Sequence, residues 1–227
     1  MNTNFKRAII DDGCSPHLVH GATFDGIFEF PLIQKPDSIR IPSRIVPFSK
    51  RNRIVDRLSA IGFYENDPIF ADVLINPEKY VSEFQKYYCF ISLDCSLYRE
   101  APIAVQIANI YRSRSVGYYY QKQGVYVIPQ VRWGSIETYT TKLFPERIAF
   151  SGIEKDSIVA IGTYGCIKTK EDKFHFKNGL ESMLETLTPK IVLVYGGMPD
   201  VIFGDFRDHT QFVHYTDWIS EKHGGGQ

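Results

Sequence analysis

Four short apolar runs, spaced 32–37 residues apart, constrain the fold of this chain more than any other feature. They show no polar alternation, which is typical of strands that are buried on both faces. Their spacing matches the length of a strand–helix unit, and connections of that length favour parallel strands. The sequence therefore predicts four buried, parallel strands of one sheet, at 88–93, 125–128, 157–161 and 190–195.

Segments between these runs have helical periodicity. Apolar residues recur on one stripe across 102–120 and again across 172–187, and Pro102 suits a first helical turn. The predicted class is α/β with a mostly parallel sheet, arranged as an incomplete or closed (β/α) barrel or as an open doubly wound sheet. The even spacing favours the barrel slightly. Neither of the two common glycine-rich nucleotide motifs follows a strand.

The first half of the chain is less regular. A strand or loop is predicted at 23–33, a strand at 68–74, and a helix from Asn76 to Tyr87 with Asn76 as its cap. The segment 34–57 holds seven basic residues, two acidic residues and three prolines, which predicts an extended loop rather than a helix. We expect residues 1–222 to form a single α/β domain that carries this basic loop, and 223–227 to be a disordered tail.

Charge and cysteine usage exclude several classes of protein. The 26 Lys and Arg balance the 26 Asp and Glu, which disfavours a globally basic nucleic-acid coat or a polybasic membrane binder. No apolar run approaches about 18 residues and the N-terminus lacks a signal-peptide core, so we expect a cytoplasmic protein that does not enter a membrane. The four cysteines form no CxxC pair and the six histidines lack metal-ligand spacing, so neither a metal nor a cofactor is predicted. No pattern predicts an oligomeric state.

Three motifs in the middle of the chain form a distinctive series. Asp94-x-Ser96-x-Tyr98 follows a predicted strand, Asn109-x-Tyr-Arg-x-Arg114 lies in a predicted helix, and Val-Ile-Pro129 leads to Trp133. Together they resemble the DUF4417 family of bacterial and bacteriophage proteins, which have no assigned activity. The resemblance extends over about residues 40–197 and is densest at 92–134, although Leu93 and Cys95 stand where many members have Pro and Phe. It implies a phage, prophage or mobile-element context and no particular reaction.

Polar residues follow each of the four predicted strands. Ligands of parallel α/β folds bind outside the carboxyl ends of the strands. We therefore predict a polar pocket at this edge, lined by Asp94, Ser96, Gln130, Arg132, Trp133, Thr163, Gly165, Tyr195 and Gly196. The sharpest expectation is that Asp94, Arg132 and Trp133 form one constellation beside a turn at Gly196.

These residue types suit the binding of an anion. Arg132 would hold a phosphate, Trp133 would stack on a base or sugar, and Asp94 would act as a general base or orient Arg132. Each also has a structural alternative. Asp94 could cap a helix or pair with Arg112, Trp133 could cover the end of the barrel, and Gly196 could be only a turn.

The basic loop is a second candidate site, in which Lys50, Arg51, Arg53 and Arg57 would contact nucleic-acid phosphates. The alternative is a solvated loop packed over the sheet. Two functions therefore stay open. One is a protein that binds or acts on a phosphate-bearing ligand, either a nucleotide or a nucleic acid. The other is a non-catalytic accessory protein that contacts a host or phage protein, in replication control or counter-defence. The residue pattern does not decide whether the protein is an enzyme.

Overall fold

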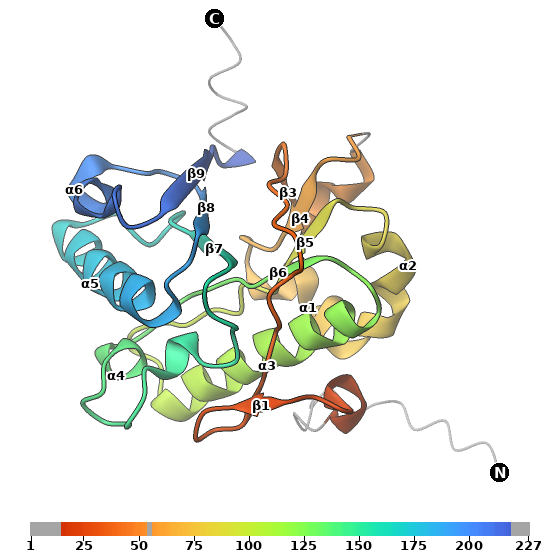
Figure 1. The fold of residues 1–227 in the computed structure, drawn as a ribbon, viewed down its shortest axis with the longest axis horizontal. Coiled ribbons are helices and arrows are strands. Elements are labelled where there is room, and N and C mark those ends of the chain that lie inside the picture. The colour runs from red at the N-terminus through yellow and green to blue at the C-terminus, as the bar shows by residue number, and fades with distance from the viewer. Residues whose placement is uncertain (1–14, 54–55, 219–227) are drawn as a thin grey trace, which may run out of the picture.

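The structure is a computed structural model that describes residues 15–53 and 56–218 (Figure 1). The expected tail at 223–227 lies outside these residues. Two parallel sheets dominate the fold, with helices packed around them. Within the described residues, no helix combines the length and apolar character needed to cross a membrane.

The first sheet contains four parallel strands that neighbour one another in chain order. They are β3 (Ile45–Pro47), β4 (Ala60–Gly62), β5 (Cys89–Ile91) and β6 (Val127–Ile128). The second sheet contains three parallel strands, again in chain order. They are β7 (Ile158–Gly162), β8 (Ile191–Tyr195) and β9 (Gln211–Tyr215).

One parallel bridge, between Gln130 and Ala160, joins the two sheets just beyond β6. The strand order in the described chain therefore runs from β3 to β9 without the reversal that defines a doubly wound sheet. The described strands do not close into a barrel either. The four predicted strands are confirmed as buried and parallel, but the prediction of one continuous sheet was wrong, since they divide between two sheets.

The two predicted helices are present. Helix α3 (Ile103–Lys122) starts directly after Pro102, and α5 (Lys170–Leu187) starts at a capping box in which Thr169 and Asp172 satisfy each other's backbone N–H groups. In Figure 1, α3 runs beneath both sheets, and α5 covers the second sheet together with the short helix α6 (Asp200–Phe203). An antiparallel pair, β1 (Phe24–Asp25) and β2 (Phe30–Pro31), lies below α3 and accounts for the segment 23–33.

Three expectations for the first half need correction. Residues 68–74 belong to a helix, α1 (Asp67–Ile75), because the buried Phe70 and Val73 are three residues apart and share a helical face. The expected helix at 76–87 is a 3-10 turn, η3 (Pro77–Tyr80), followed by one turn, α2 (Val81–Phe84). Asn76 occupies the N-cap position of η3 as predicted, but its side chain makes no capping hydrogen bond, and its amide nitrogen donates to Asp72 at 2.6 Å. Within 34–57 lie β3 and the 3-10 segment η2 (Phe48–Arg53), so this segment is not simply a loop.

Side chains from all seven parallel strands meet in one apolar interior. Its buried members are Ile45, Ala60, Cys89, Ile91, Ile128, Ile158, Ala160, Ile191, Leu193, Tyr195 and Tyr215. The Tyr215 hydroxyl also donates to the carbonyl of Pro42 at 2.7 Å, which links β9 to the segment before β3. The two sheets therefore share a core although only one residue pair bridges them. The remaining short elements, η1 (Pro16–Val19), α4 (Ile136–Tyr139), η4 (Ile148–Phe150) and η5 (Gly204–Phe206), lie in the connections.

Arg114 of α3 is buried at the joint between the two sheets, with only 2% of its surface exposed. Its guanidinium donates three hydrogen bonds of 2.9–3.0 Å to the main-chain carbonyls of Gln130, Ala149 and Ser151. Burial lowers the pKa of Arg114 to about 10, so the side chain is still charged at neutral pH. The charge is stabilised by carbonyl dipoles, and the same three bonds fix α3 against the segment after β6 and against η4.

Replacing Arg114 with Met should lower the free energy of unfolding by about 2–4 kcal/mol, because buried carbonyl oxygens lose their donors. Arg207→Met is the matched control, since Arg207 forms an exposed ion pair with Asp200 and its loss should cost at most about 1 kcal/mol. Urea unfolding followed by circular dichroism measures both. Equal effects of the two variants would contradict the role given to Arg114.

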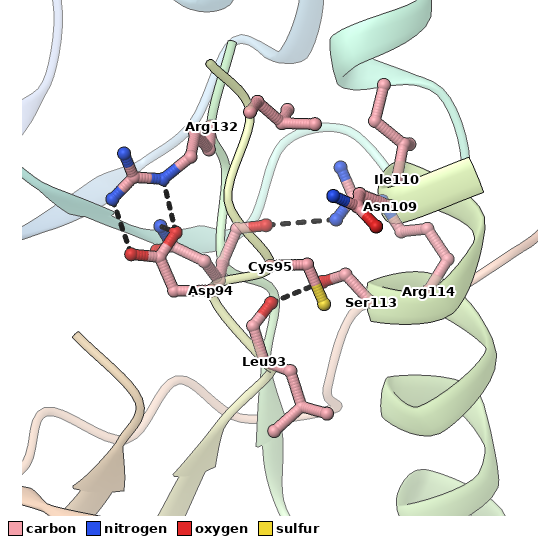
Figure 2. A pocket seen from close by; sticks show the side chains of 10 residues that line it. Leu93, Asp94, Cys95, Asn109, Ile110, Ser113, Arg114 and Arg132 are labelled. Carbon is pink, nitrogen blue, oxygen red and sulfur yellow. Dashed lines mark hydrogen bonds and ion pairs between the residues drawn. The ribbon is translucent and has the colours of Figure 1, made fainter. Parts of the chain in front are cut away.

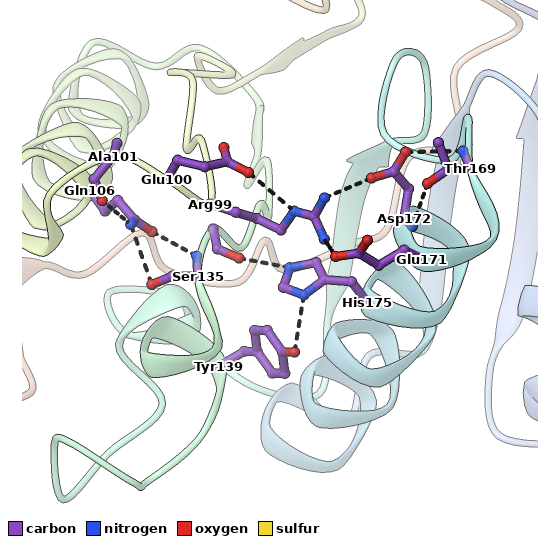
Figure 3. Close-up of polar contacts among 11 residues, drawn as sticks. Arg99, Glu100, Ala101, Gln106, Ser135, Tyr139, Thr169, Glu171, Asp172 and His175 are labelled. Carbon is purple, nitrogen blue, oxygen red and sulfur yellow. Dashed lines mark hydrogen bonds and ion pairs between the residues drawn. The ribbon is translucent and has the colours of Figure 1, made fainter.

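The start of α5 is fixed by a polar network around Arg99 and His175 (Figure 3). Arg99 lies in the loop between β5 and α3 and pairs with Asp172 at 2.9 Å and with Glu171 at 3.4 Å. His175 donates from Nε2 to the carbonyl of Gly134 at 2.8 Å and has Tyr139 Oη 3.3 Å from its Nδ1. The network therefore joins α5 to the loops that follow β5 and β6.

Stability should depend on the protonation of His175. Burial lowers the pKa of this half-buried imidazole, and the positive charge of Arg99 lowers it further. The carboxylates of Asp172 and Glu171 raise the pKa, but they do not reverse the shift. The folded state therefore binds the proton less readily than the unfolded state. The free energy of unfolding should fall as the pH drops below about 6.5, and above that pH this histidine should cause no loss of stability. In His175→Gln this component of the pH dependence should disappear. Melting temperatures measured from pH 5 to pH 8 give the comparison, and parallel profiles for the two proteins would disprove it.

Candidate functional site

Asp94 and Arg132 form an ion pair at the carboxyl ends of β5 and β6 (Figure 2). The guanidinium donates from Nε to Oδ1 and from Nη2 to Oδ2 of Asp94, each at 2.5 Å. Asp94 is 5% exposed, whereas the Arg132 side chain keeps 23% of its surface exposed. Burial opposes the charge on Arg132, but the carboxylate of Asp94 outweighs it and raises the pKa of the guanidinium well above its usual value. The expected contact between these two residues is therefore present.

The side chain of Gln130 hydrogen-bonds to Asp94 and to Tyr64. Its amide nitrogen donates to Asp94 Oδ1 at 2.8 Å, and its amide oxygen accepts from the hydroxyl of Tyr64 at 3.0 Å. The Tyr64 ring stacks on Tyr195 of β8, with ring centres 4.7 Å apart. Burial raises the pKa of the Tyr64 hydroxyl well above its usual value, so it remains a neutral donor. A chain of hydrogen bonds and stacked rings thus connects the first sheet to the second.

The interior of this polar cluster has little free space. A cavity of about 10 Å³ lies between the pair and α3, lined by Leu93, Asp94, Cys95, Leu97, Asn109, Ile110, Ser113, Arg114, Gln130 and Arg132 (Figure 2). That volume is about the size of one water molecule. The expected pocket is therefore not a chamber for a nucleotide. A ligand of that size would have to lie on the solvent side of Arg132.

The solvent side of Arg132 faces the loop after β7. Its Nη1 lies 3.2 Å from Sγ of Cys166, which is partly exposed. Gly165 has a positive φ of 79°, and a Cβ placed there would meet no atom within 4 Å, so its backbone is open to solvent. Thr163 and Gly196 pack against each other instead, and the Thr163 hydroxyl donates to the carbonyl of Gly197 at 2.7 Å.

Two of the predicted site residues, Trp133 and Ser96, are engaged by neighbouring helices. Trp133 is 7% exposed and packs on Phe176, and its indole lies so close to Gly179 of α5 that a Cβ there would be 2.1 Å from Nε1. The prediction that Trp133 presents a face to a ligand was wrong, because α5 covers the indole. Ser96 donates from its backbone N–H and its hydroxyl to Asp67 of α1, at 3.1 and 2.7 Å.

The basic segment does not form one surface. Lys50 and Arg51 lie in η2, beyond the carboxyl end of β3, whereas Arg57 precedes β4. The Arg51 guanidinium stacks on Phe48, 4.0 Å from the ring centre, and pairs with Glu83 at 3.0 Å. The side chain of Arg53 is outside the described part of the chain. A single nucleic-acid contact through all four residues is therefore not supported by their placement.

Sequence reasoning missed Tyr64 and Cys166 as members of the cluster. Tyr64 follows a strand of only three residues, Ala60–Gly62, which gives no periodic signal. Cys166 follows β7, and its contact with Arg132 depends on how the two sheets meet. Sequence reasoning also missed a polar groove of about 450 Å³ at the opposite end of the strands, lined by Gln34, Lys35, Pro36, Asp37, Ile39, Glu154, Asp156, Ser157 and Lys190. Among the residues that the structure describes, no three His, Cys, Asp or Glu side chains gather closely enough to hold a metal ion.

The burial of Asp94 changes the expected effect of breaking the pair. Asp94→Asn keeps the shape but leaves the Arg132 guanidinium without its counter-charge, which should cost about 1–3 kcal/mol, less than for a fully buried pair because Arg132 reaches solvent. Asp205→Asn is the matched control, since Asp205 forms an exposed ion pair with Lys177 and its loss should cost at most about 1 kcal/mol. Urea unfolding of Asp94→Asn, Arg132→Met and the double variant Asp94→Asn/Arg132→Met gives the coupling energy. A coupling near zero would show that the pair is not stabilising.

The chain is similar in sequence to one protein family and to proteins of two bacteriophages. A family model described as "Domain of unknown function (DUF4417)" matches residues 22–216. The chain is 33% identical to the Gene 1 protein of Mycobacterium phage D29 over 137 residues, which are 60% of this chain and 48% of that protein. It is 29% identical to the Gene 1 protein of Mycobacterium phage L5 over 165 residues, 71% of this chain and 69% of that protein. The match thus spans about half the length of the D29 protein. No solved structure matches the chain. Because the family model covers most of the sequence, the chain belongs to the DUF4417 family.

Proposed function

We propose that this protein binds a phosphate-bearing ligand on the solvent side of Arg132, at the carboxyl ends of its strands. The observation that carries the proposal is the way in which Asp94 holds the guanidinium. Two of its N–H groups are fixed by the carboxylate and a third points at Cys166. An arginine has five N–H donors, so two remain for a ligand in a fork of defined direction.

The surroundings of Arg132 support an anion rather than a neutral ligand. The guanidinium is charged at any physiological pH, because its pKa is raised by Asp94. The nearest loop carries an open backbone at Gly165, which allows a ligand to approach main-chain N–H groups closely. Lys168 follows in the same loop, Lys170 begins α5, and both are exposed. A phosphate placed here would be met by one fixed cation and by two mobile ones.

Asp94 fits a positioning role better than a catalytic one. Both of its carboxylate oxygens accept hydrogen bonds from Arg132, and one of them also accepts from Gln130. A general base needs a free oxygen that can reach the proton it removes. The proposal is therefore a binding function in which Asp94 orients Arg132.

Nucleoside monophosphate and inorganic phosphate, titrated at low ionic strength and followed by calorimetry, test the proposal. Arg132→Lys keeps the charge but lacks the fork, and it should weaken binding about tenfold or more. Arg147→Lys is the matched control, because Arg147 also pairs with a carboxylate, Glu185, but lies away from the strand ends. Melting temperatures of both variants separate a binding loss from unfolding. If the unchanged protein binds neither phosphate ligand at low salt, the proposal fails.

A second function, contact with a host or phage protein, is supported by a different observation. Ile39, Ile41 and Leu58 are exposed apolar side chains near the amino ends of β3 and β4, at the opposite end from Arg132. Exposed apolar side chains that lie together are typical of protein interfaces. Leu58→Asp should then reduce association with the partner and leave phosphate binding unchanged. Sedimentation of the protein at increasing concentration shows whether the partner is a second copy of the chain.

A further inference from the structure

Exposed aromatic rings occur in the segments that follow β5 and β7 and that surround the solvent side of Arg132. Four described aromatic side chains are exposed by more than a third: Phe24, Tyr98, Tyr164 and Phe174. Phe24 lies in the β1–β2 hairpin, but the other three follow β5 or β7 and are 67%, 52% and 70% exposed. Large aromatic side chains are usually mostly buried, so three on one end of the molecule need an explanation.

Two contacts bring the segments that carry these rings together. Arg99, which directly follows Tyr98, pairs with Asp172 in the first turn of α5, and Figure 3 shows the two segments facing each other. Phe174 lies two residues further along the same helix and therefore points to a different side of it than Asp172 does. Cys166, two residues after Tyr164, contacts Arg132. The loop after β5, the loop after β7 and the start of α5 are therefore neighbours around the solvent side of Arg132.

The charges on this end are arranged in favour of an anion. Three of its carboxylates are paired with arginines: Asp94 with Arg132, and Asp172 and Glu171 with Arg99. Asp67 and Glu65, which follow β4 at the same end, accept hydrogen bonds from Ser96 and Ser49 instead. Lys168, Lys170 and Lys173 lie between Tyr164 and Phe174, and none of them forms an ion pair among the described residues. Three unpaired lysines between two exposed rings along one segment match what a polyanion with exposed bases requires.

From this arrangement we infer that the strand-end surface binds single-stranded nucleic acid, with Tyr98, Tyr164 and Phe174 stacking on bases and the three lysines contacting phosphates. The inference rests on the proposed function, because it identifies the phosphate-bearing ligand at Arg132 as one unit of a polynucleotide. A duplex fits less well, since paired bases are stacked within the helix and cannot lie on the rings. The open, shallow site agrees with an extended ligand, because the enclosed cavity has room only for a water molecule.

The test is fluorescence anisotropy of labelled single strands of about 16 nucleotides, as oligo-dT and as oligo-U, at low and moderate salt. Tyr98→Ala, Tyr164→Ala and Phe174→Ala should each weaken binding about 5- to 100-fold, which is the range for loss of one stacked base. Because all three rings are exposed, the variants should keep the melting temperature of the unchanged protein. Phe24→Ala removes an exposed ring from the β1–β2 hairpin and should leave the affinity unchanged.

The lysines are tested by the salt dependence. Replacing Lys168, Lys170 and Lys173 together with Gln should reduce the slope of log affinity against log salt by about 2, since each phosphate contact on a single strand contributes about 0.7. The control replaces Lys86, Lys155 and Lys190, which are exposed elsewhere, and should leave the slope unchanged. The ratio of oligo-dT to oligo-U affinity tells whether DNA or RNA is the better ligand.

Several outcomes would overturn the inference. They are equal binding of single strands and duplexes, aromatic variants that bind like the unchanged protein, or the absence of oligonucleotide binding. If the protein binds a nucleoside monophosphate through Arg132 but binds a 16-mer no more tightly, the polynucleotide surface is disproved and the proposed function stands. If a 16-mer binds through the rings while Arg132→Lys has no effect, the surface stands and the proposed function fails.

Discussion

The three hydrogen bonds of Arg114 are the interaction on which the rest of the structure depends. The two parallel sheets share an apolar core, but only one backbone bridge among the described residues joins them. Arg114 reaches from α3 to the carbonyl of Gln130, the bridge residue itself, and to the carbonyls of Ala149 and Ser151 before β7. A buried cation without a carboxylate is costly unless every donor is used well. Here its donors are used to hold together the helix and the two halves of the fold.

The candidate site follows from that joint. Gln130 offers its carbonyl to Arg114 and its side chain to Asp94 and Tyr64, so the same residue belongs to the structural contact and to the polar cluster. The cluster is rigid for this reason: Asp94 is held by two partners, and Arg132 is held by Asp94. Preorganised donors that need no rearrangement bind an anion more strongly than flexible ones. The proposed binding of a polyanion rests on this fixed guanidinium and on the exposed lysines outside it.

The strand ends could be predicted from sequence because they depend on local patterns. The apolar runs at 157–161 and 190–195 give β7 and β8, and parallel pairing then places the residues that follow them at one edge. The Asp94–Arg132 contact could be expected for the same reason. Tyr64 and Trp133 could not, since their positions are set by packing between elements: Tyr64 crosses to β7 and β8, and Trp133 is covered by α5. The strands β3 and β4 were missed because three residues flanked by prolines or loops show no periodic pattern. Helix α1 was mistaken for a strand because every residue of 68–74 except Asp72 is apolar, so the segment shows no helical stripe.

The stacking of Tyr64 against the second sheet has a consequence for how relatives can diverge. The ring lies directly over Gly162, and a Cβ at that position would be 2.5 Å from it. Because Tyr64 is also stacked on Tyr195 and bonded to Gln130, it cannot move aside without losing both contacts. Positions 64 and 162 are thus tied to each other across the two sheets: a side chain at 162 is tolerated only in a lineage that has already replaced the tyrosine with something smaller. Among relatives, a residue other than glycine at position 162 should therefore occur together with a smaller residue at position 64.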